Sequence, residues 1–350
     1  MTVPETRDSR SFDLRTSSER ERMQREMVEF QKHAIAAVIP CYRVEREIQS
    51  VLQAIPDYIK HIIVVDDASP DSTADLVSAA GEHDNRITLI RHSSNQGVGG
   101  AMITGYRKTL DYGAQVVVKI DGDGQMDMEY LPRLLQPLIE GKADYTKGNR
   151  FRDFKSLQQM PFIRRVGNMG LAFLAKAATG YWQTFDPTNG FNAIRSEVLA
   201  ELPLEQINRT YYFETSMLAN LYLIGAVVKD VPMPARYRGE VSSLLVHRIL
   251  FEFPPKLIST LLRRLILKNF IYDFSMGSIY HLTGVPLLLF AFIFGIIKWI
   301  QYASIHVPAP TGTVMLATLS VLLGLQLVLS AIEIDLRSVP TEPLSSPLNA

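Results

Sequence analysis

Residues 116–125, Val-Val-Val-Lys-Ile-Asp-Gly-Asp-Gly-Gln, carry the pattern that decides the fold, an apolar run that ends in an acidic turn. The run from Val116 to Ile120 has the β-branched composition of a strand. If the backbone stays extended beyond it, residues 121, 123 and 125 point to the same side, because successive side chains of a strand alternate. Two carboxylates and an amide oxygen would then lie together at the end of a strand.

Two earlier segments repeat this pattern. Ala34–Ile39 and Ile62–Val65 are predicted strands, and polar turns follow them at Pro40–Tyr42 and Asp66–Asp71. Segments of helical character alternate with these runs up to about Pro234, which is typical of an α/β domain with a mostly parallel sheet. In open parallel sheets the ligand binds beyond the carboxyl ends of the strands, so the three turns predict the site.

The acidic turn offers hard oxygen ligands at Asp121, Asp123 and Gln125, a set that suits Mg²⁺ or Mn²⁺. Two partly buried carboxylates repel each other, and a divalent cation that bridges them to a diphosphate removes that cost. Such a cation would act as a Lewis acid on a departing nucleotide diphosphate. The spacing alone fits a solvated acidic loop equally well, and the position directly after an apolar strand favours the site.

Two further turns have structural alternatives. Asp66 and Asp67 can accept hydrogen bonds from a base or ribose, or can cap a helix that is predicted to begin near Ser72. The stretch Asn95-Gln-Gly-Val-Gly-Gly100 does not match the dinucleotide fingerprint, which makes a Rossmann dehydrogenase a poor fit. Close backbone packing is the predicted role of these glycines.

Composition limits the classes of protein to which this chain can belong. The chain has 350 residues, of which 47% are hydrophobic, and no formal net charge, which predicts one catalytic domain with an appendage and no general attraction to nucleic acid. The single cysteine, Cys41, excludes an intramolecular disulfide and a Cys-based zinc site, which fits a reducing compartment. Residues 1–33 form a charged arm without the apolar core of a signal peptide.

The C-terminal part has the composition of a membrane segment. From Phe274 to Ile332 the only formally charged side chain is Lys298. Within it, Ile279–Ile300 and Thr313–Ile332 each reach the ~20 residues that a helix needs to cross the hydrocarbon core. We therefore predict a two-helix transmembrane hairpin over residues 273–338, followed by a tail over 339–350, with a buried core hairpin as the alternative.

Basic residues precede the first span, and the Gln301–Gly312 turn has neither lysine nor arginine, so the catalytic domain is predicted to be cytoplasmic. These residues are Arg248, Lys256, Arg263, Arg264 and Lys268. Between them, apolar residues at helical spacing predict an amphipathic helix that lies on the membrane surface within 244–272. They are Leu257, Ile258, Leu261, Leu262, Leu265 and Ile266. A surface helix that packs on the catalytic domain is the alternative.

The order and spacing of six motifs resemble the family 2 glycosyltransferases, specifically the dolichol-phosphate mannosyltransferase and polyprenyl-phosphate glycosyltransferase branch. The motifs are Val38-Ile39-Pro40-Cys41-Tyr42, Val65-Asp66-Asp67-Ala68-Ser69, Asp121-Gly122-Asp123-Gly124-Gln125, Gly148-Asn149-Arg150-Phe151, Asp186 through Gly190-Phe191, and Arg236 through Gly239-Glu240. The similarity runs from about Ala36 to Ser243, inside a predicted domain of residues 34–243.

This resemblance implies a GT-A fold, a nucleotide-diphosphate sugar donor and a metal cofactor, Mg²⁺ or Mn²⁺. It implies a donor pocket that includes Pro40, Tyr42, Val65, Asp67, Asp121, Gly122, Asp123 and Arg236, with the metal served by Asp121, Asp123 and Gln125. It places Arg150 and Arg164 near the acceptor phosphate and Asp186 where a catalytic base is sometimes assigned, with Glu214 a weaker candidate. The sequence departs from the family at Val44, where an acidic residue is usual and Glu45 could substitute, and at Ser242, where a lysine is often found.

The predicted reaction is an inverting transfer of a sugar, from a donor of the GDP-mannose or UDP-glucose type, to a polyprenyl or dolichyl phosphate in the lipid bilayer. A processive polysaccharide synthase usually has a Gln-x-x-Arg-Trp motif, and neither Trp182 nor Trp299 lies in that setting. A catalytically silent, membrane-tethered scaffold is the other alternative, against which the intact acidic turn argues. A lone hairpin also leaves room for helices to pack between subunits of a homo-oligomer.

Overall fold

The computed structural model describes residues 28–149, 162–184, 186, 189–233 and 246–348, with only the backbone described for 162–169 and 246–251. The predicted arm 1–33 lies mostly outside these ranges. Its last residues belong to the domain, because Phe30 is buried in the core beside Tyr58.

The catalytic domain is built on a seven-stranded sheet with the strand order β3-β2-β1-β4-β6-β5-β7. β6 runs antiparallel to both of its neighbours and every other pair is parallel, which confirms the mostly parallel sheet. The strands are β1 (Ile35–Cys41), β2 (Ile59–Asp66), β3 (Ile87–Arg91), β4 (Val116–Lys119), β5 (Tyr145–Asn149), β6 (Asn192–Arg195) and β7 (Val228–Pro232).

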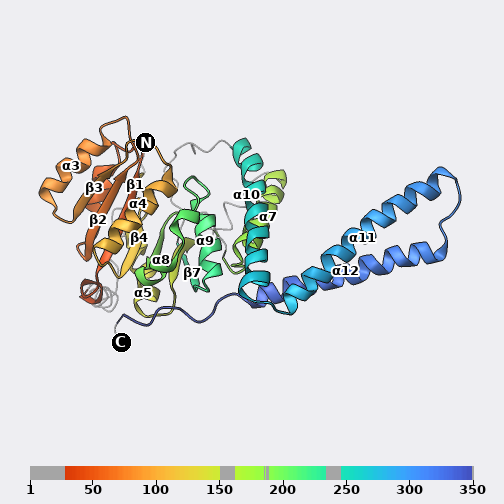
Figure 1. Ribbon diagram of the computed structural model, residues 1–350. Helices are drawn as coiled ribbons and strands as arrows, with labels where there is room; N and C mark the ends of the chain where they lie inside the picture. The colour runs from red at the N-terminus through yellow and green to blue at the C-terminus, as the bar shows by residue number, and fades with distance from the viewer. Residues whose placement is uncertain (1–27, 150–161, 185, 187–188, 234–245, 349–350) are drawn as a thin grey trace, which may run out of the picture.

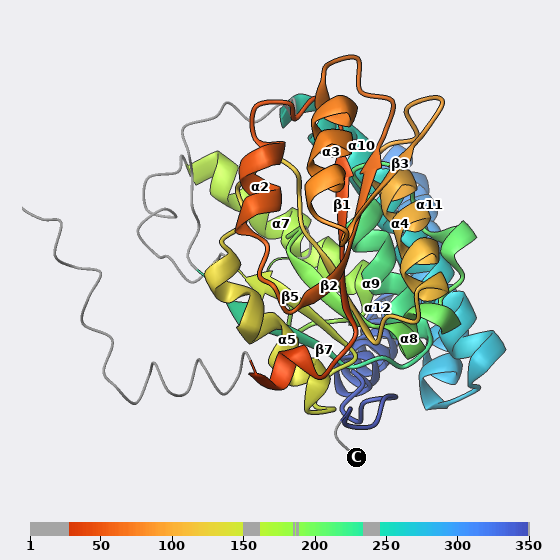
Figure 2. The same ribbon diagram turned by 90° about the vertical axis from the view of Figure 1, so that its left-hand side faces the viewer.

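Helices cover both faces of the sheet (Figures 1 and 2). On one face the core includes α2 (Ile48–Ala54), α3 (Thr73–His83) and α5 (Leu131–Ile139), and on the other α4 (Val98–Asp111), α8 (Ser196–Glu201) and α9 (Phe213–Leu223). Successive residues of β1 therefore enter different cores, Ala37 on the first face and Val38 on the second. Burial on both faces explains why the strands are continuous apolar runs rather than alternating ones.

Helix α10 (Val246–Ile266) packs against α7 (Phe162–Thr179) at the side of this domain. Leu257 is buried with Ala175, Ala178 and Tyr212, so the alternative of a helix packed on the catalytic domain is realised on one face. A second row of apolar side chains stays exposed, formed by Ile258, Leu262 and Ile266. Contact of this second row with a membrane stays a prediction.

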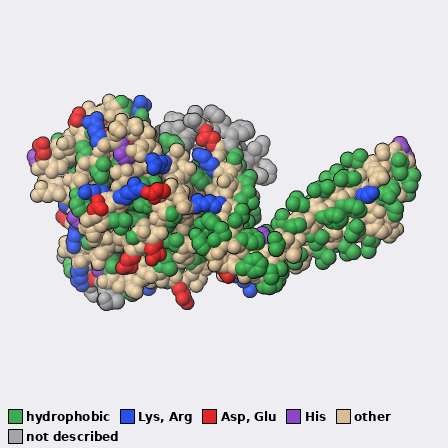
Figure 3. Space-filling model, in the orientation of Figure 1, with side chains coloured by type: hydrophobic (Ala, Val, Ile, Leu, Met, Phe, Trp, Pro, Cys, Tyr) green, Lys and Arg blue, Asp and Glu red, His purple; other side chains and the backbone are tan. Residues whose placement is uncertain are grey.

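A hairpin of two long helices, α11 (Met276–Ser304) and α12 (Thr311–Arg337), projects from the body (Figure 1). The helices have 29 and 27 residues, and by length and composition both can cross a membrane. They approach closely at Gly284, where an added Cβ would lie 2.9 Å from the Cβ of Leu327. Their outer surface is apolar and exposed (Figure 3), so the alternative of a buried core hairpin is wrong.

The base of the hairpin is tied to the domain by Asp335 of α12. Nη1 and Nη2 of Arg264 each lie 2.8 Å from one of its carboxylate oxygens, and the Lys268 ammonium lies 2.9 Å from Oδ1. The Trp182 indole also donates to Oδ2, at 3.1 Å. Arg264, one of the basic residues before the first span, is thus only 1% exposed, and a carboxylate of α12 compensates its charge inside the protein.

The predicted tail returns to the catalytic domain. The backbone N–H groups of Leu344 and Ser345 donate to the buried carboxylate of Asp144, each at 3.0 Å. Leu348 N–H donates to the Ile139 carbonyl at 3.0 Å. The segment after the hairpin thus packs against the end of α5 and the connection that leads to β5.

Candidate functional site

The carboxyl ends of β1, β2 and β4 lie side by side, as the sequence predicts. Pro40 pairs with Val65 and Cys41 with Asp66 in the parallel register of β1 and β2. On the other side of β1, Ile120 N–H donates to the Val38 carbonyl at 3.0 Å. The three polar turns therefore meet at one edge of the sheet.

The acidic turn after β4 lines a pocket of about 80 Å³. Asp121, Asp123 and Gln125 all contribute to its wall, so the structure brings the three predicted metal ligands together. Other lining residues come from distant parts of the chain and include Asn189, Gly190, Phe191 and Met233. Within the turn, Asp123 Oδ1 accepts a hydrogen bond from Gln125 N–H at 3.0 Å, and Gly124 has φ +71°, a conformation that favours glycine.

Two of the three predicted ligands are carboxylates, and Asp127 also lines the pocket. Within the ranges that the structure describes, no group of three or more His, Cys, Asp or Glu is arranged to hold a metal ion. Two carboxylates and an amide oxygen still suit a hard divalent cation that takes its other ligands from a diphosphate or water. The residues present therefore fit Mg²⁺ or Mn²⁺ as a cation shared with a substrate rather than one enclosed by protein.

Lys119, the last residue of β4, lies beneath the pocket. Its ammonium forms salt bridges of 2.7 Å to Asp121 Oδ1 and 3.1 Å to Glu214 Oε1 of α9. Burial acts to lower the pKa of Lys119, but the carboxylates of Asp121 and Glu214 outweigh burial and hold this pKa above its ordinary value. The lysine is therefore charged at neutral pH.

The acidic turn packs directly on the turn after β1. An added Cβ on Gly122 would lie 3.0 Å from Cys41 Sγ and 3.3 Å from Val44 Cγ2. Tyr42, a predicted nucleotide contact, is exposed at this edge, and the Arg43 guanidinium lies 5.3 Å from the centre of its ring. The turn that carries the predicted metal ligands therefore lies against the turn that carries Tyr42.

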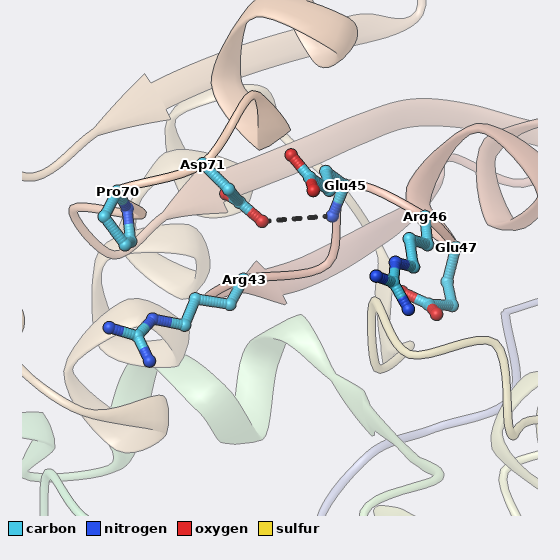
Figure 4. A pocket seen from close by; sticks show the side chains of 6 residues that line it. All are labelled: Arg43, Glu45, Arg46, Glu47, Pro70 and Asp71. Carbon is cyan, nitrogen blue, oxygen red and sulfur yellow. Dashed lines mark hydrogen bonds between the residues drawn. The ribbon is translucent and has the colours of Figure 1, made fainter.

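A wider hollow of about 420 Å³ lies beside this edge, between the turns that follow β1 and β2 (Figure 4). Glu45 N–H donates to Asp71 Oδ2 at 3.3 Å, and the Glu45 carboxylate accepts from Ser72 N–H at 3.1 Å. Glu45, suggested as a substitute for the acidic residue that is usual at Val44, therefore links these two turns.

Asp67 is almost fully buried, and its carboxylate contacts two backbone N–H groups and one imidazole nitrogen. Gln96 N–H and Gly97 N–H each donate at 2.8 Å, and His92 Nδ1 lies 2.7 Å away. In this structure Asp67 fixes the loop before α4, and its direct contact with a nucleotide stays a prediction. The alternative of an N-terminal cap is wrong for Asp67, because Asp71 accepts from Thr73 N–H at the start of α3.

The glycines of that loop confirm the prediction of close backbone packing. A Cβ on Gly99 would lie 2.2 Å from the Asn208 carbonyl oxygen, and one on Gly97 would lie 2.5 Å from that of Arg209. Gly97 also has φ +83°, so both its conformation and its surroundings require glycine.

The predicted acceptor side is described only in part. Asp186 is fully buried, and its carbonyl accepts from the N–H of Asn189, which lines the pocket. Arg150 and Arg236 lie outside the described residues. Arg164 belongs to the first turn of α7, but its side chain is also outside the described part.

Lys119 is not among the site residues predicted from the sequence. A signal was present, because a lysine interrupts an otherwise apolar strand directly before the acidic turn. Glu214 was only a weak candidate, since no local pattern shows that a residue of α9 reaches the end of β4.

Comparison with known proteins relates this chain to glycosyltransferases. A family model described as glycosyl transferase family 2 matches residues 36–202. A UDP-N-acetylglucosamine–dolichyl-phosphate N-acetylglucosaminyltransferase of Methanococcus voltae is 32% identical over 191 residues, which cover 51% of this chain and 75% of that one. An undecaprenyl-phosphate mannosyltransferase of Micrococcus luteus is 29% identical over 202 residues, covering 57% and 82%.

Among solved structures, glucosyl-3-phosphoglycerate synthase of M. tuberculosis is similar with a TM-score of 0.51 and 21% identity. The similarity covers 68% of this chain and 84% of that one. The same synthase has been solved with Mn²⁺, uridine diphosphate and phosphoglyceric acid. At this identity the comparison supports the fold of the domain and nothing finer.

Proposed function

Because this chain belongs to glycosyl transferase family 2 and has the GT-A fold, we propose that it transfers a sugar from a nucleoside-diphosphate donor to a polyprenyl phosphate. Similarity to enzymes named for dolichyl and undecaprenyl phosphates supports this choice of acceptor. The convergence of Asp121, Asp123 and Gln125 in one pocket at the carboxyl edge of the sheet carries the proposal.

On the donor side, Asp121, Asp123 and Gln125 would hold Mg²⁺ or Mn²⁺ against the diphosphate. The cation supplies Lewis-acid stabilisation of the negative charge on the leaving group. Pro40, Tyr42 and the buried residue Val65 form the adjoining edge, where the base and ribose would bind. Asp67 supports that edge through its hydrogen bonds to the loop before α4.

On the acceptor side, a phosphate oxygen attacks the anomeric carbon from the face opposite the diphosphate. The new carbon–oxygen bond forms as the bond to the diphosphate breaks, so the configuration inverts. A phosphate monoester has a second pKa of about 6 and is largely ionised at neutral pH. It needs little help from a base, so the role proposed for Asp186 is to orient the acceptor rather than to deprotonate it.

Two anionic substrates must approach each other in this reaction, and cations reduce their repulsion. Arg150 and Arg164 are proposed partners of the acceptor phosphate, and Arg236 is a proposed partner of the donor diphosphate. A guanidinium suits these tasks because it stays charged and can donate two parallel hydrogen bonds to a phosphate.

The hairpin and the exposed row on α10 would place the domain at the bilayer surface. The helices of 29 and 27 residues extend about 40 Å at ~1.5 Å per residue, more than the ~30 Å hydrocarbon core. We propose that the domain faces the cytoplasm, because Arg248, Lys256 and Arg263 precede the hairpin and its turn has no such residues. Arg264 and Lys268 carry less weight in this argument, since both pair with Asp335.

The proposal is tested by sugar transfer to a short polyprenyl phosphate in detergent, with UDP- and GDP-sugars, with Mn²⁺ or Mg²⁺ and with a chelator. We expect a glycolipid product from one donor that disappears with the chelator. Donor hydrolysis without lipid product would point to another acceptor, such as a growing polysaccharide. Absence of nucleotide binding would favour the silent scaffold and contradict the proposal.

A further inference from the structure

Lys119 is a charged side chain inside the sheet, directly before the acidic turn. The other residues of β4, Val116 to Val118, are apolar and fully buried, and Lys119 itself is 1% exposed. Taking an ammonium out of water costs several kcal/mol unless it is paired and hydrogen-bonded. Packing alone therefore does not explain a lysine at this position.

The two partners of this lysine differ in their access to the pocket. The Asp121 side chain is 31% exposed and lines the pocket, whereas the Glu214 side chain is 12% exposed and does not. The ammonium is thus bound by Glu214 on the inner side and by Asp121 on the side of the pocket.

Gly190 encloses the same carboxylate from another direction. A Cβ added to Gly190 would lie 2.5 Å from Asp121 Oδ2 and 2.7 Å from Lys119 Nζ. The Asp121 carboxylate therefore has Oδ1 on the buried ammonium and Oδ2 beside the backbone of Gly190, a residue of the pocket wall. Its orientation is set before any ligand arrives.

We propose that Lys119 is a positioning residue for Asp121: held by Glu214, its ammonium fixes one carboxylate oxygen and presents the other to the divalent cation. The inference rests on the proposed function in taking Asp121 as a metal ligand. It adds that the buried pair of Lys119 and Glu214, which does not contact the metal, determines how tightly the metal binds. Partners that orient metal ligands typically contribute about 10–100-fold to metal affinity or activity.

The sign of the effect on metal affinity distinguishes this role from two others. Removing a cation near a divalent ion would strengthen metal binding if only Coulomb repulsion mattered. A purely structural lysine would change the melting temperature and leave metal affinity unchanged. A positioning lysine, when removed, weakens metal binding because Asp121 loses its fixed orientation.

The experiment titrates the full chain in detergent with Mn²⁺ in the presence of UDP or GDP and follows the electron paramagnetic resonance of the free ion. We expect K119M to weaken Mn²⁺ binding by about 10-fold or more. The double variant K119M/E214M removes one positive and one negative charge, so it leaves the net charge unchanged. We expect the same weakening there. K142M, which removes an exposed lysine paired with Glu140, is the matched control and should bind Mn²⁺ as the wild type does.

Unchanged or tighter Mn²⁺ binding by folded K119M would overturn the proposal. If K119M does not fold, the double variant decides, because apolar pairs often replace buried ion pairs without loss of stability. Wild-type affinity in that variant would also overturn it. D121N distinguishes the metal assignment from the positioning role. If D121N binds Mn²⁺ as the wild type does, the metal assignment itself is wrong. If D121N weakens Mn²⁺ binding and K119M does not, only the positioning role is contradicted.

Discussion

At the scale of single residues, the acidic turn concentrates the chemistry in a few oxygen atoms. Asp121 is held from below by Lys119, and Asp123 is held within the turn through Gln125 N–H. Both carboxylates reach one pocket, and Asp121 is also linked through Lys119 to Glu214 of α9. Their loss should therefore affect catalysis far more than folding.

We expect D123A to lower metal-dependent sugar transfer by at least about 100-fold, since Lewis-acid stabilisation of the leaving group contributes several kcal/mol. The chain should stay folded and bound to membranes, because Asp123 is only partly buried. Initial rates at saturating Mn²⁺ and a thermal melt measure the two effects. D111N, at the exposed end of α4, is the matched control and should keep wild-type activity. Full activity of D123A would refute the metal assignment.

Cys41 should be inert despite its place beside the site. Burial raises the pKa of its thiol well above the ordinary value, and the nearby carboxylates of Asp66 and Asp121 raise it further. Alkylation requires the thiolate, so native protein should react with iodoacetamide at pH 8 far more slowly than unfolded protein. Mass spectrometry of timed samples measures the two rates. Equal rates would show that the contact between Gly122 and Cys41 opens readily in solution.

At the scale of elements, close backbone contact adds to the hydrogen bonds of Asp67 in fixing the N-terminal end of α4. Gly99 lies against Asn208 and Arg209, residues that lead into α9. Because α9 carries Glu214, this contact helps to place the partner of Lys119 beneath the pocket.

We expect G99A to destabilise the domain by about 3 kcal/mol, because its Cβ would lie 2.8 Å from Arg209 Cα and 2.2 Å from a carbonyl oxygen. G81A in α3 is the matched control, since its Cβ would meet nothing closer than 3.8 Å. That variant should be more stable by roughly 0.5–1 kcal/mol, the helix preference of alanine over glycine. Urea unfolding measures both, and a neutral G99A would contradict the close packing.

At the scale of the whole molecule, the hairpin is joined to the catalytic domain by charge as well as by chain connectivity. The Asp335 carboxylate pairs with Arg264 and Lys268 and accepts a hydrogen bond from the indole of Trp182. Trp182 lies in the segment that leads to Asp186. The tail then returns to Asp144 beneath the sheet. The hairpin and the segment that contains Asp186 are therefore parts of one connected structure.

We expect D335N to lower the free energy of unfolding by about 3–5 kcal/mol, because it leaves the buried Arg264 without its counter-charge. E333Q is the matched control: its pair with Arg337 is exposed on both sides and should contribute at most about 1 kcal/mol. Thermal unfolding of the full chain in detergent compares the two. Equal stability of D335N and E333Q would show that the Asp335 cluster does not hold the hairpin.

The sequence by itself determined the parts of this protein that depend on local composition and period. Apolar runs followed by acidic turns predicted the strand ends, and their order along the chain identified the family. Long uncharged stretches predicted the hairpin, since the length of an apolar helix is a property of consecutive residues.

Only the tertiary structure decided which distant groups meet. Lys119 and Glu214 are 95 residues apart, and Arg264 and Asp335 are 71 apart, so no local pattern links them. The antiparallel insertion of β6 beside β4 sets Lys119 opposite Asn192, just after Gly190. Local periodicity fixes the face to which a side chain points, whereas strand order and helix packing fix the partner that compensates a buried charge.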